Sequence, residues 1–387
     1  MSDICLAEVE RLAGELGFSC ANASPFVTLR DPLHPANWTL PLLEFTVVAG
    51  AVLALVAAVR RLRGTGDPTD LVLWFSGVVY LLIIEPPIYF PRVFGVEDQL
   101  GIVFVHNEFT VDFLFDRLPL YIVALYPALL TLACHIVRGL GIVDRYGPLA
   151  GAVAVGFVHS CFYEIFDHLG PQLRWWIWNS DNAATRPAFA SVPIASIAIF
   201  SALAPALLAY LVHRLVALPF ARGQRPGAGA LVCRTISVGI LTSIGIVVCG
   251  IPAWIFPGRP VVQGWVYWVE IGVVAIGGAV TVARALGARC GAGELGYVRI
   301  FGAAFLAVMV IGWGAAMPEY LGATGGITAS GTPTGNLAYA SICFLVALVL
   351  VVASFTPVDR SPIGRMSPVT GRVRRYRGHV RSAGRGW

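Results

Sequence analysis

Nine apolar stretches, each long enough to cross a lipid bilayer, constrain this chain more than any other feature of its sequence. A transmembrane helix needs about 20 predominantly apolar residues. Only α-helices and closed β-barrels satisfy every backbone hydrogen-bonding group inside lipid, and these stretches are too long and too uniformly apolar for barrel strands. The sequence therefore predicts an all-α fold, a polytopic transmembrane helical bundle of about nine spans. The predicted spans cover residues 40–59, 71–90, 118–137, 149–166, 192–215, 231–256, 261–285, 298–316 and 337–355.

The overall composition agrees with a membrane location. Of the 387 residues, 57% are hydrophobic and 13% are charged, whereas soluble globular chains carry about 25% charged residues. These proportions exclude an ordinary soluble domain and a disordered chain, and they predict a multi-pass protein of the cell membrane. The chain is rich in Ala, Gly, Val and Arg and contains no Lys, which is typical of a GC-rich bacterial genome.

The distribution of arginine predicts the orientation of the spans. All 27 basic residues are Arg, and 20 of them lie in or beside the segments that follow the odd-numbered spans. Loops on the cytoplasmic side of membrane proteins carry an excess of Arg and Lys. We therefore expect the N-terminus outside the cell and the C-terminus in the cytoplasm. Residues 1–36 lack a basic region followed by an apolar one, so no signal peptide is expected there.

Three regions follow from this topology. Residues 1–36 form an extracytoplasmic N-terminal segment, residues 37–356 the transmembrane domain, and residues 357–387 an Arg-rich cytoplasmic tail that we expect to be disordered. The tail holds eight Arg and one Asp, which accounts for the net charge of +5. Each Arg near the bilayer contributes about 1 kcal/mol of attraction to anionic lipid headgroups. Docking of RNA or protein is the alternative, although no nucleic-acid partner is expected.

Cys5 and Cys20 share the N-terminal segment, either as a disulfide or as two thiols.

Ionisable residues at membrane depth are costly and mark candidate functional sites. Here they gather at the outer ends of spans two to four, where Glu85 ends span two. If residues 106–117 are helical, Glu108, Asp112 and Asp116 share one face and repel one another. A bound cation, a neighbouring Arg (Arg117 or Arg92) or protonation would offset that repulsion. This segment is either part of a metal or acid–base site or a solvated acidic helix face.

A second group of ionisable residues ends span four. In a helix, His159, Tyr163 and Asp167 form one stripe, and Ser160, Glu164 and His168 form the next. Glu164 and His168 are four residues apart, so they could chelate a divalent metal ion or act as an acid–base pair. The alternative is a structural polar network. No HExxH or HxxxH spacing occurs, which excludes a zincin-like zinc helix.

Three tryptophans follow span four. Trp175, Trp176 and Trp178, beside Arg174, fit an interfacial aromatic belt. They also fit a wall that holds the apolar chain of a lipid or isoprenoid, or a cation–π site.

Residues 166–181 carry an aromatic residue followed by Asp167, a Gly three residues later, Trp-Trp-x-Trp, and a further Asp. This pattern resembles a motif in a family of uncharacterised polytopic integral membrane proteins. Asn179 stands where that family has His. The resemblance covers about twenty residues and implies no activity.

Two classes of function fit these residues best. The first is a membrane-embedded enzyme that acts on a lipid or isoprenoid at the outer leaflet, by metal-assisted hydrolysis or by carboxyl-initiated protonation and cyclisation. Glu164 and Asp167 are its leading acid–base candidates. The second is a transporter of a small or amphipathic substrate, although no inverted repeat is visible. A structural membrane subunit is a third alternative. For the enzyme, the candidate catalytic residues are Glu85, Glu108, Asp112, His159, Glu164, Asp167 and His168, and the candidate substrate-binding residues are Tyr163, Arg174, Trp175, Trp176 and Trp178.

Overall fold

The computed structural model describes residues 4–21, 23–30, 33, 37–287 and 296–355. Within these residues, nine helical segments are long and apolar enough to cross a membrane. The prediction of an all-α bundle with nine membrane spans is confirmed. The spans are Thr39–Thr65, Thr69–Tyr89, Leu120–Gly139, Ile142–Asp167, Ile194–Ala221, Ala228–Trp254, Pro260–Gly287, Val298–Leu321 and Leu337–Phe355. The predictions for the tail fall on residues outside the described part of the chain.

Seven of the described spans contain a single helix each, and spans five and eight are composite. Span five joins α7 (Ile194–Ser196), α8 (Ala204–Val212) and α9 (Leu218–Ala221) through the π-helical segments η2 (Ile197–Leu203) and η3 (His213–Ala217). Span eight joins the π-helical η4 (Val298–Gly302) to α12 (Ala303–Leu321). The remaining spans are α2 (Thr39–Thr65), α3 (Thr69–Tyr89), α5 (Leu120–Gly139), α6 (Ile142–Asp167), α10 (Ala228–Trp254), α11 (Pro260–Gly287) and α13 (Leu337–Phe355).

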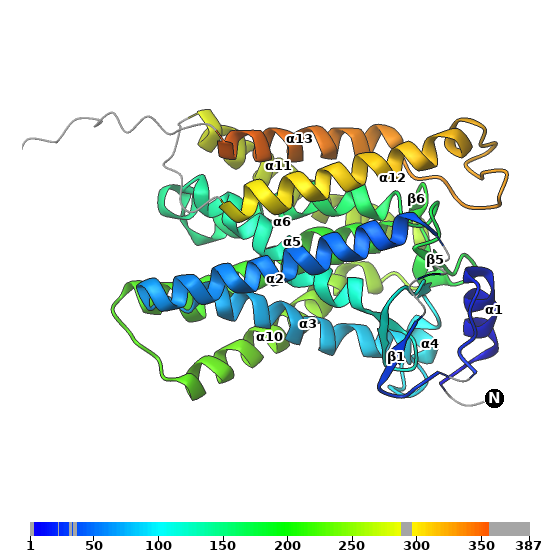
Figure 1. Ribbon diagram of the computed structural model, residues 1–387, viewed down its shortest axis with the longest axis horizontal. Helices are drawn as coiled ribbons and strands as arrows, with labels where there is room; N and C mark the ends of the chain where they lie inside the picture. The colour runs from blue at the N-terminus through cyan, green and yellow to red at the C-terminus, as the bar shows by residue number, and fades with distance from the viewer. Residues whose placement is uncertain (1–3, 22, 31–32, 34–36, 288–295, 356–387) are drawn as a thin grey trace, which may run out of the picture.

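The spans lie roughly side by side, with α5 and α6 in the interior of the bundle (Figure 1). Helix α5 packs against α2, α3 and α6, and helix α6 packs also against α8, α11 and α13. The outward faces of the peripheral helices expose large apolar side chains, among them Trp265, Ile276 and Ile342. Such a surface is stable against lipid tails rather than water.

Four span boundaries differ from the prediction by five residues or more. Span five ends at Ala221 instead of residue 215, and span eight ends at Leu321 instead of residue 316. The other two are the end of α2 and the start of α6. Helix α2 continues past residue 59 to Thr65 and includes Arg60, Arg61 and Arg63. Arginine is a good helix former, and its long side chain reaches from an apolar helix to the polar boundary. Helix α6 begins at Ile142 and is interrupted at Gly147, whose φ of 87° is not helical, before Pro148. The predicted start at residue 149 therefore falls directly after this break.

Short strands gather at one end of the bundle, which we call the strand end (Figure 1). Strand β1 (Val27–Leu29) pairs with β3 (Val111–Phe113), which pairs with β4 (Leu118–Pro119). Strand β2 (Phe104–His106) pairs antiparallel with β5 (Trp176–Trp178). A third pair joins β6 (Ala188–Phe189) and β7 (Val192–Pro193). The connections at this end also contain α4 (Glu97–Leu100) and the 3-10 turn η1 (Ala183–Thr185).

The expected helix over residues 106–117 is wrong. Residues 111–113 form β3 instead, and three residues in succession then have positive φ: Leu114 (53°), Phe115 (56°) and Asp116 (57°). A right-handed helix cannot contain such a run, because its residues all have negative φ. The acidic side chains of this segment therefore do not share a helix face. The pairing of β3 with β1, which is distant in the sequence, outweighs the helical spacing of these acidic residues.

The N-terminal helix α1 (Ala7–Leu16) covers the strand end. Its buried Val9 and Leu12 belong to a small apolar cluster with Ile102 and Val105, and Ile177 packs against that cluster. Residues Cys5 and Cys20, at the two ends of this segment, form a disulfide. The open choice between a disulfide and two thiols is therefore decided for the disulfide.

Candidate functional site

A cavity lies beneath the strand end, inside the bundle. Its polar lining comes from five separate parts of the chain: α3, β2, α5, α6 and α7. The cavity is largely apolar elsewhere, and aromatic side chains from β2 and β5 form its roof. A concave, mostly apolar site with a few convergent polar groups is the usual form of a small-molecule site. The polar and aromatic lining residues are Glu85, Phe104, His106, Tyr126, Tyr163, Phe166, Asp167, Trp176, Trp178, Ser196 and Phe200.

Glu85 lies one turn before the end of α3, ahead of Pro86 and Pro87, and its side chain is 4% exposed. The hydroxyl group of Tyr126, on α5, donates a hydrogen bond to Glu85 Oε1. Glu85 Oε2 has no hydrogen-bond partner, and no described Arg or His forms an ion pair with this carboxyl. A carboxyl group in such surroundings is costly to ionise.

Asp167 is the last residue of α6 and is 1% exposed. Its Oδ2 accepts a hydrogen bond of 3.2 Å from the Ser196 hydroxyl group, which α7 supplies at the start of span five. The predicted acid–base residue therefore lines the same cavity as Glu85, from a different helix. Both carboxyl groups have a neutral hydroxyl donor as their hydrogen-bond partner.

His106 supplies a neutral imidazole to the roof of the cavity. Its Nδ1 lies 3.1 Å from the Tyr121 hydroxyl oxygen, and that hydroxyl donates to the Trp175 carbonyl oxygen at 2.8 Å. Because the Tyr121 proton is directed at the carbonyl group, Nδ1 of His106 must be the donor to Tyr121, which leaves Nε2 unprotonated. Burial lowers the pKa of His106 to about 3, so the ring is neutral at physiological pH.

The tryptophans of the strand end are mostly interior residues. Trp175 and Trp176 are 0% and 2% exposed, so the interfacial-belt alternative is wrong for these two. The indole of Trp175 donates to Thr39 Oγ1 at 3.0 Å, which fixes its position against α2. Trp176 and Trp178 line the cavity, in keeping with the aromatic-wall alternative. Arg174 lies apart from them and donates to the Ser330 carbonyl oxygen at 2.9 Å.

His159 and Tyr163 lie deeper, along the inward face of α6. His159 Nδ1 donates to the Ser201 carbonyl oxygen at 2.8 Å, and its ring stacks on Tyr163 with the centroids 5.6 Å apart. Both residues line a second cavity, and Tyr163 lines the first one as well. The η2 segment, which contains Ser201, is π-helical, and π-helical turns are frequent at functional sites.

Glu164 and His168 form a second buried group, and neither residue lines a cavity. Both side chains are 0% exposed, and His168 Nε2 lies 3.5 Å from Glu164 Oε2. The backbone N–H of Asn336 donates to His168 Nδ1 at 3.2 Å, so the proton of the neutral ring is on Nε2. A protonated nitrogen cannot bind a metal ion. The geometry therefore favours an acid–base or structural pair over chelation at this point.

Arg30 joins the acidic residues of the strand end. It forms ion pairs with Glu108 and with Asp116 (2.9 Å), and its Nε lies 3.9 Å from Asp112 Oδ2. Glu44, on α2, accepts a hydrogen bond from Thr110 in the same region. The sequence analysis named Arg92 and Arg117 as the compensating cations and missed Arg30. Only the pairing of β1 with β3 brings Arg30 to this position.

Burial and mutual repulsion perturb these acidic groups. Burial, with the neighbouring Asp112 and Asp116 carboxylates, raises the pKa of Glu108 to about 9. Burial and the carboxylates of Asp116 and Glu44 raise the pKa of Asp112 to about 8, although Arg30 acts in the opposite direction. Both carboxyl groups therefore bind protons more tightly than free side chains do, and the contact with Arg30 opposes this effect. None of the three Arg30-linked carboxyl residues lines either cavity.

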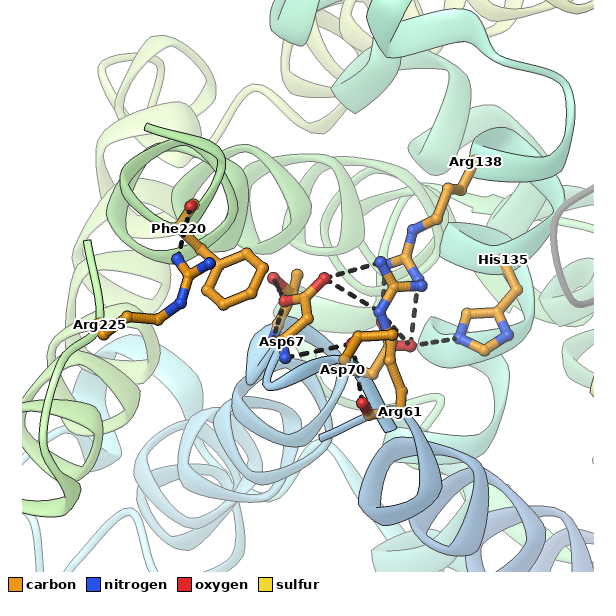
Figure 2. Close-up of polar contacts among 9 residues, drawn as sticks. Arg61, Asp67, Asp70, His135, Arg138, Phe220 and Arg225 are labelled. Carbon is orange, nitrogen blue, oxygen red and sulfur yellow. Dashed lines mark hydrogen bonds and ion pairs between the residues drawn. The ribbon is translucent and has the colours of Figure 1, made fainter. Parts of the chain in front are cut away.

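A second ionic network (Figure 2) lies where α2 ends, at the end of the bundle away from the strands (Figure 1). Arg138, on α5, donates to Asp70 at 2.6 and 3.0 Å, and His135 Nε2 lies 3.2 Å from the same carboxylate. Arg61, at the end of α2, donates to Asp67 at 2.7 and 3.0 Å. The network connects α2, α3 and α5, and its charges are balanced. The sequence analysis did not predict it, because its members are up to 77 positions apart.

The described residues contain few groupings of side chains that could bind a metal ion. Within them, the one group of three or more candidate ligand atoms lying close together is Cys5, Glu10 and Cys20. The two sulfur atoms of that group form a disulfide, so neither is a thiolate. Arg30 occupies the position between the strand-end carboxylates where a cation would bind.

No family model, curated protein or solved structure matches this chain. The resemblance of residues 166–181 to a membrane-protein family stays an expectation. The site must therefore be interpreted from its own geometry.

Proposed function

We propose that this chain is a membrane-embedded enzyme that acts on a lipid or isoprenoid, with Glu85 and Asp167 as its acid–base pair. The observation that carries the proposal is that two buried carboxyl groups, from α3 and α6, line one largely apolar cavity without a cation partner. Asp70 and Asp116, which are also buried, instead contact Arg. Buried ionisable groups without such pairing are typical of functional sites in membrane proteins.

The chemistry that fits these groups is carboxyl-initiated protonation. One carboxyl group gives its proton to a double bond of the substrate and leaves a carbocation. Ring closure, followed by loss of a proton to the other carboxylate, returns the product to neutrality. The rings of Tyr126, Tyr163 and Trp176 line the cavity and stabilise a cation by cation–π attraction. Metal-assisted hydrolysis is less suited, because the described residues hold no preformed metal site at this cavity.

The proposal includes the orientation of the chain. We infer from the arginine distribution that the strand end faces the outside of the cell, so that the cavity lies in the outer leaflet. The Arg-rich residues after 356 then face the cytoplasm and anionic lipid.

The experiment compares lipid extracts of host membranes that carry the wild-type chain, Glu85→Gln or Asp167→Asn, by mass spectrometry. We expect a new lipid product with the wild type and a loss of about 100-fold or more with either variant, the scale of general acid–base catalysis. Glu319→Gln, which changes an exposed carboxyl group remote from both cavities, is the matched control.

Membrane insertion and thermal unfolding of each variant are measured in parallel. If Glu85→Gln and Asp167→Asn both fail to insert, the carboxyl pair is structural. If both insert and the product persists, the two residues are not catalytic. If the wild type moves a labelled lipid across liposomes without forming a product, the chain is a transporter and the enzyme proposal is wrong.

A further inference from the structure

A second cavity adjoins the first and extends it away from the strand end. The two cavities share four lining residues: Leu125, Tyr126, Tyr163 and Phe200. The deeper cavity lies between α3, α5, α6 and span five. Beyond the shared residues, its lining includes Leu130, Ala204 and Leu208.

The polarity of the lining changes along this joined space. Glu85, Asp167 and Ser196 line only the part beneath the strand end. The deeper part contains no carboxyl group, and its His159 already donates to a backbone carbonyl oxygen. An occupant with one polar end and one apolar chain matches this gradient. Its polar group would lie near the strand end and its chain toward the bilayer interior, as in a lipid of the same leaflet.

The charge of the lining restricts the polar group further. No Arg lines either cavity, and the chain contains no Lys. A phosphate or diphosphate group would be buried without a cation, beside two carboxyl groups. Burying an unpaired charge costs several kcal/mol, and like charges at short range add to that cost. A neutral group such as a hydroxyl can instead donate or accept a hydrogen bond at Glu85, Asp167 or Ser196.

The roof of the cavity favours the same occupant. Strands β2 and β5 close the strand end with Phe104, Trp176 and Trp178, and α1 covers the outer face of this pair through Val105 and Ile177. A large hydrated headgroup would have to displace this layer. A small polar end makes no such demand on the layer.

We propose that the joined cavities bind a neutral single-chain lipid of the prenyl alcohol type and discriminate against its phosphate ester. The polar end lies beside Glu85 and Asp167, and the chain lies against Leu130 and Leu208. This inference rests on the proposed function in taking the cavity as the substrate site, but it concerns binding rather than turnover.

The test uses the purified full chain in nanodiscs and two probes with the same chain, geranylgeraniol and geranylgeranyl monophosphate. Binding is measured with radiolabelled probes and by the thermal shift. We expect saturable binding of the alcohol and binding of the monophosphate weaker by about tenfold or more, a difference of 1.4 kcal/mol. Equal or tighter binding of the monophosphate, or no saturable binding of the alcohol, overturns the inference.

Two variants test the position of the chain. Ala204→Phe fills the deeper cavity, so it should weaken binding of geranylgeraniol by about tenfold and leave that of the shorter geraniol unchanged. Ala303→Phe makes the same change on an exposed face of α12 and should affect neither probe. Leu208→Ala enlarges the same cavity and should shift the preference toward longer prenols. If neither cavity variant alters the length preference, the chain does not bind there.

The outcome also separates this inference from the proposed function. Binding of the neutral alcohol without any lipid product leaves the inference standing and removes the enzyme proposal. A product that depends on Glu85 but forms only from a phosphorylated lipid supports the enzyme proposal and overturns the inference of a neutral prenyl alcohol.

Discussion

At the scale of single residues, two pairs of buried carboxyl groups in the described part of the chain differ in their partners. Asp70 and Asp116 contact arginine, and such pairs balance charge within the fold. Glu85 and Asp167 receive hydrogen bonds only from hydroxyl groups, so their charge has no internal balance. Removing one partner of a buried ion pair is destabilising, whereas removing an unbalanced carboxylate need not be. Because Glu85 and Asp167 also line the cavity, a functional explanation suits these two residues better than a structural one.

The acidic group around Arg30 makes stability depend on pH. In the unfolded chain Glu108 and Asp112 ionise near pH 4, whereas in the folded chain their pKa values are raised to about 9 and about 8. Both groups thus bind more protons in the folded state. The stabilisation is fully present below about pH 4, declines as the pH rises above that value, and is lost once the pH has risen through 8 to 9. We expect the free energy of unfolding to fall by at most about 1.4 kcal/mol per pH unit for each group.

The measurement is thermal unfolding of the purified protein between pH 6 and pH 9. Glu108→Gln imitates the protonated side chain and should flatten the dependence. Glu97→Gln alters an exposed carboxylate paired with Arg92 and should leave the slope unchanged. A wild-type melting temperature that is constant over this range would contradict the assignment. The other charged groups that act on Glu108, namely Arg30, Asp116 and Arg117, are unchanged in every variant.

At the scale of elements, the pairing of β2 with β5 is what closes the cavity. Gly170, between α6 and β5, allows the Trp176 ring to pass close to the backbone, because any β-carbon at this position would overlap that ring. We expect Gly170→Ala to displace Trp176 and to destabilise the fold by about 1–3 kcal/mol, the usual cost of overpacking. Tryptophan fluorescence and thermal unfolding in detergent report both effects.

The matched control for this prediction is Gly322→Ala, at the end of α12. There the nearest atoms to a new β-carbon lie 3.8 Å away, which is ordinary contact. Its melting temperature should stay close to that of the wild type. If the two variants melt alike and retain the same fluorescence spectrum, the close packing of Trp176 on Gly170 does not restrict this position.

At the scale of the whole molecule, the arrangement of arginine predicts which end faces the cytoplasm. Single cysteines introduced at Arg259, on the strand-end side, and at Gln224, on the opposite side, test this in intact cells with a membrane-impermeant maleimide. We expect labelling of Arg259→Cys only, because the segments rich in Arg stay inside. Permeabilised cells, in which both positions should react, provide the control. Labelling of Gln224→Cys alone would reverse the topology.

Much of the membrane architecture could be predicted from the sequence, because apolar length is a local property. Each of the nine described spans overlaps a predicted one, and two of the four largest shifts, at Arg60–Arg63 of α2 and at Gly147 of α6, have local causes. The composition and spacing also directed attention to the outer ends of spans two to four. Asp167 and Glu85, which line the cavity, were both among the candidates.

What the sequence by itself determined is therefore the class of fold, the number of spans and the list of costly polar residues, all of which follow from hydrophobicity along the chain. Only the tertiary structure decided which of those residues meet. It placed Asp167 and Glu85 in the lining of one cavity, left Glu164 and His168 outside that lining, and brought Arg30 to Glu108 through the pairing of β1 with β3. The physical reason is that such contacts depend on long-range packing and strand pairing. No periodicity within a single segment encodes them.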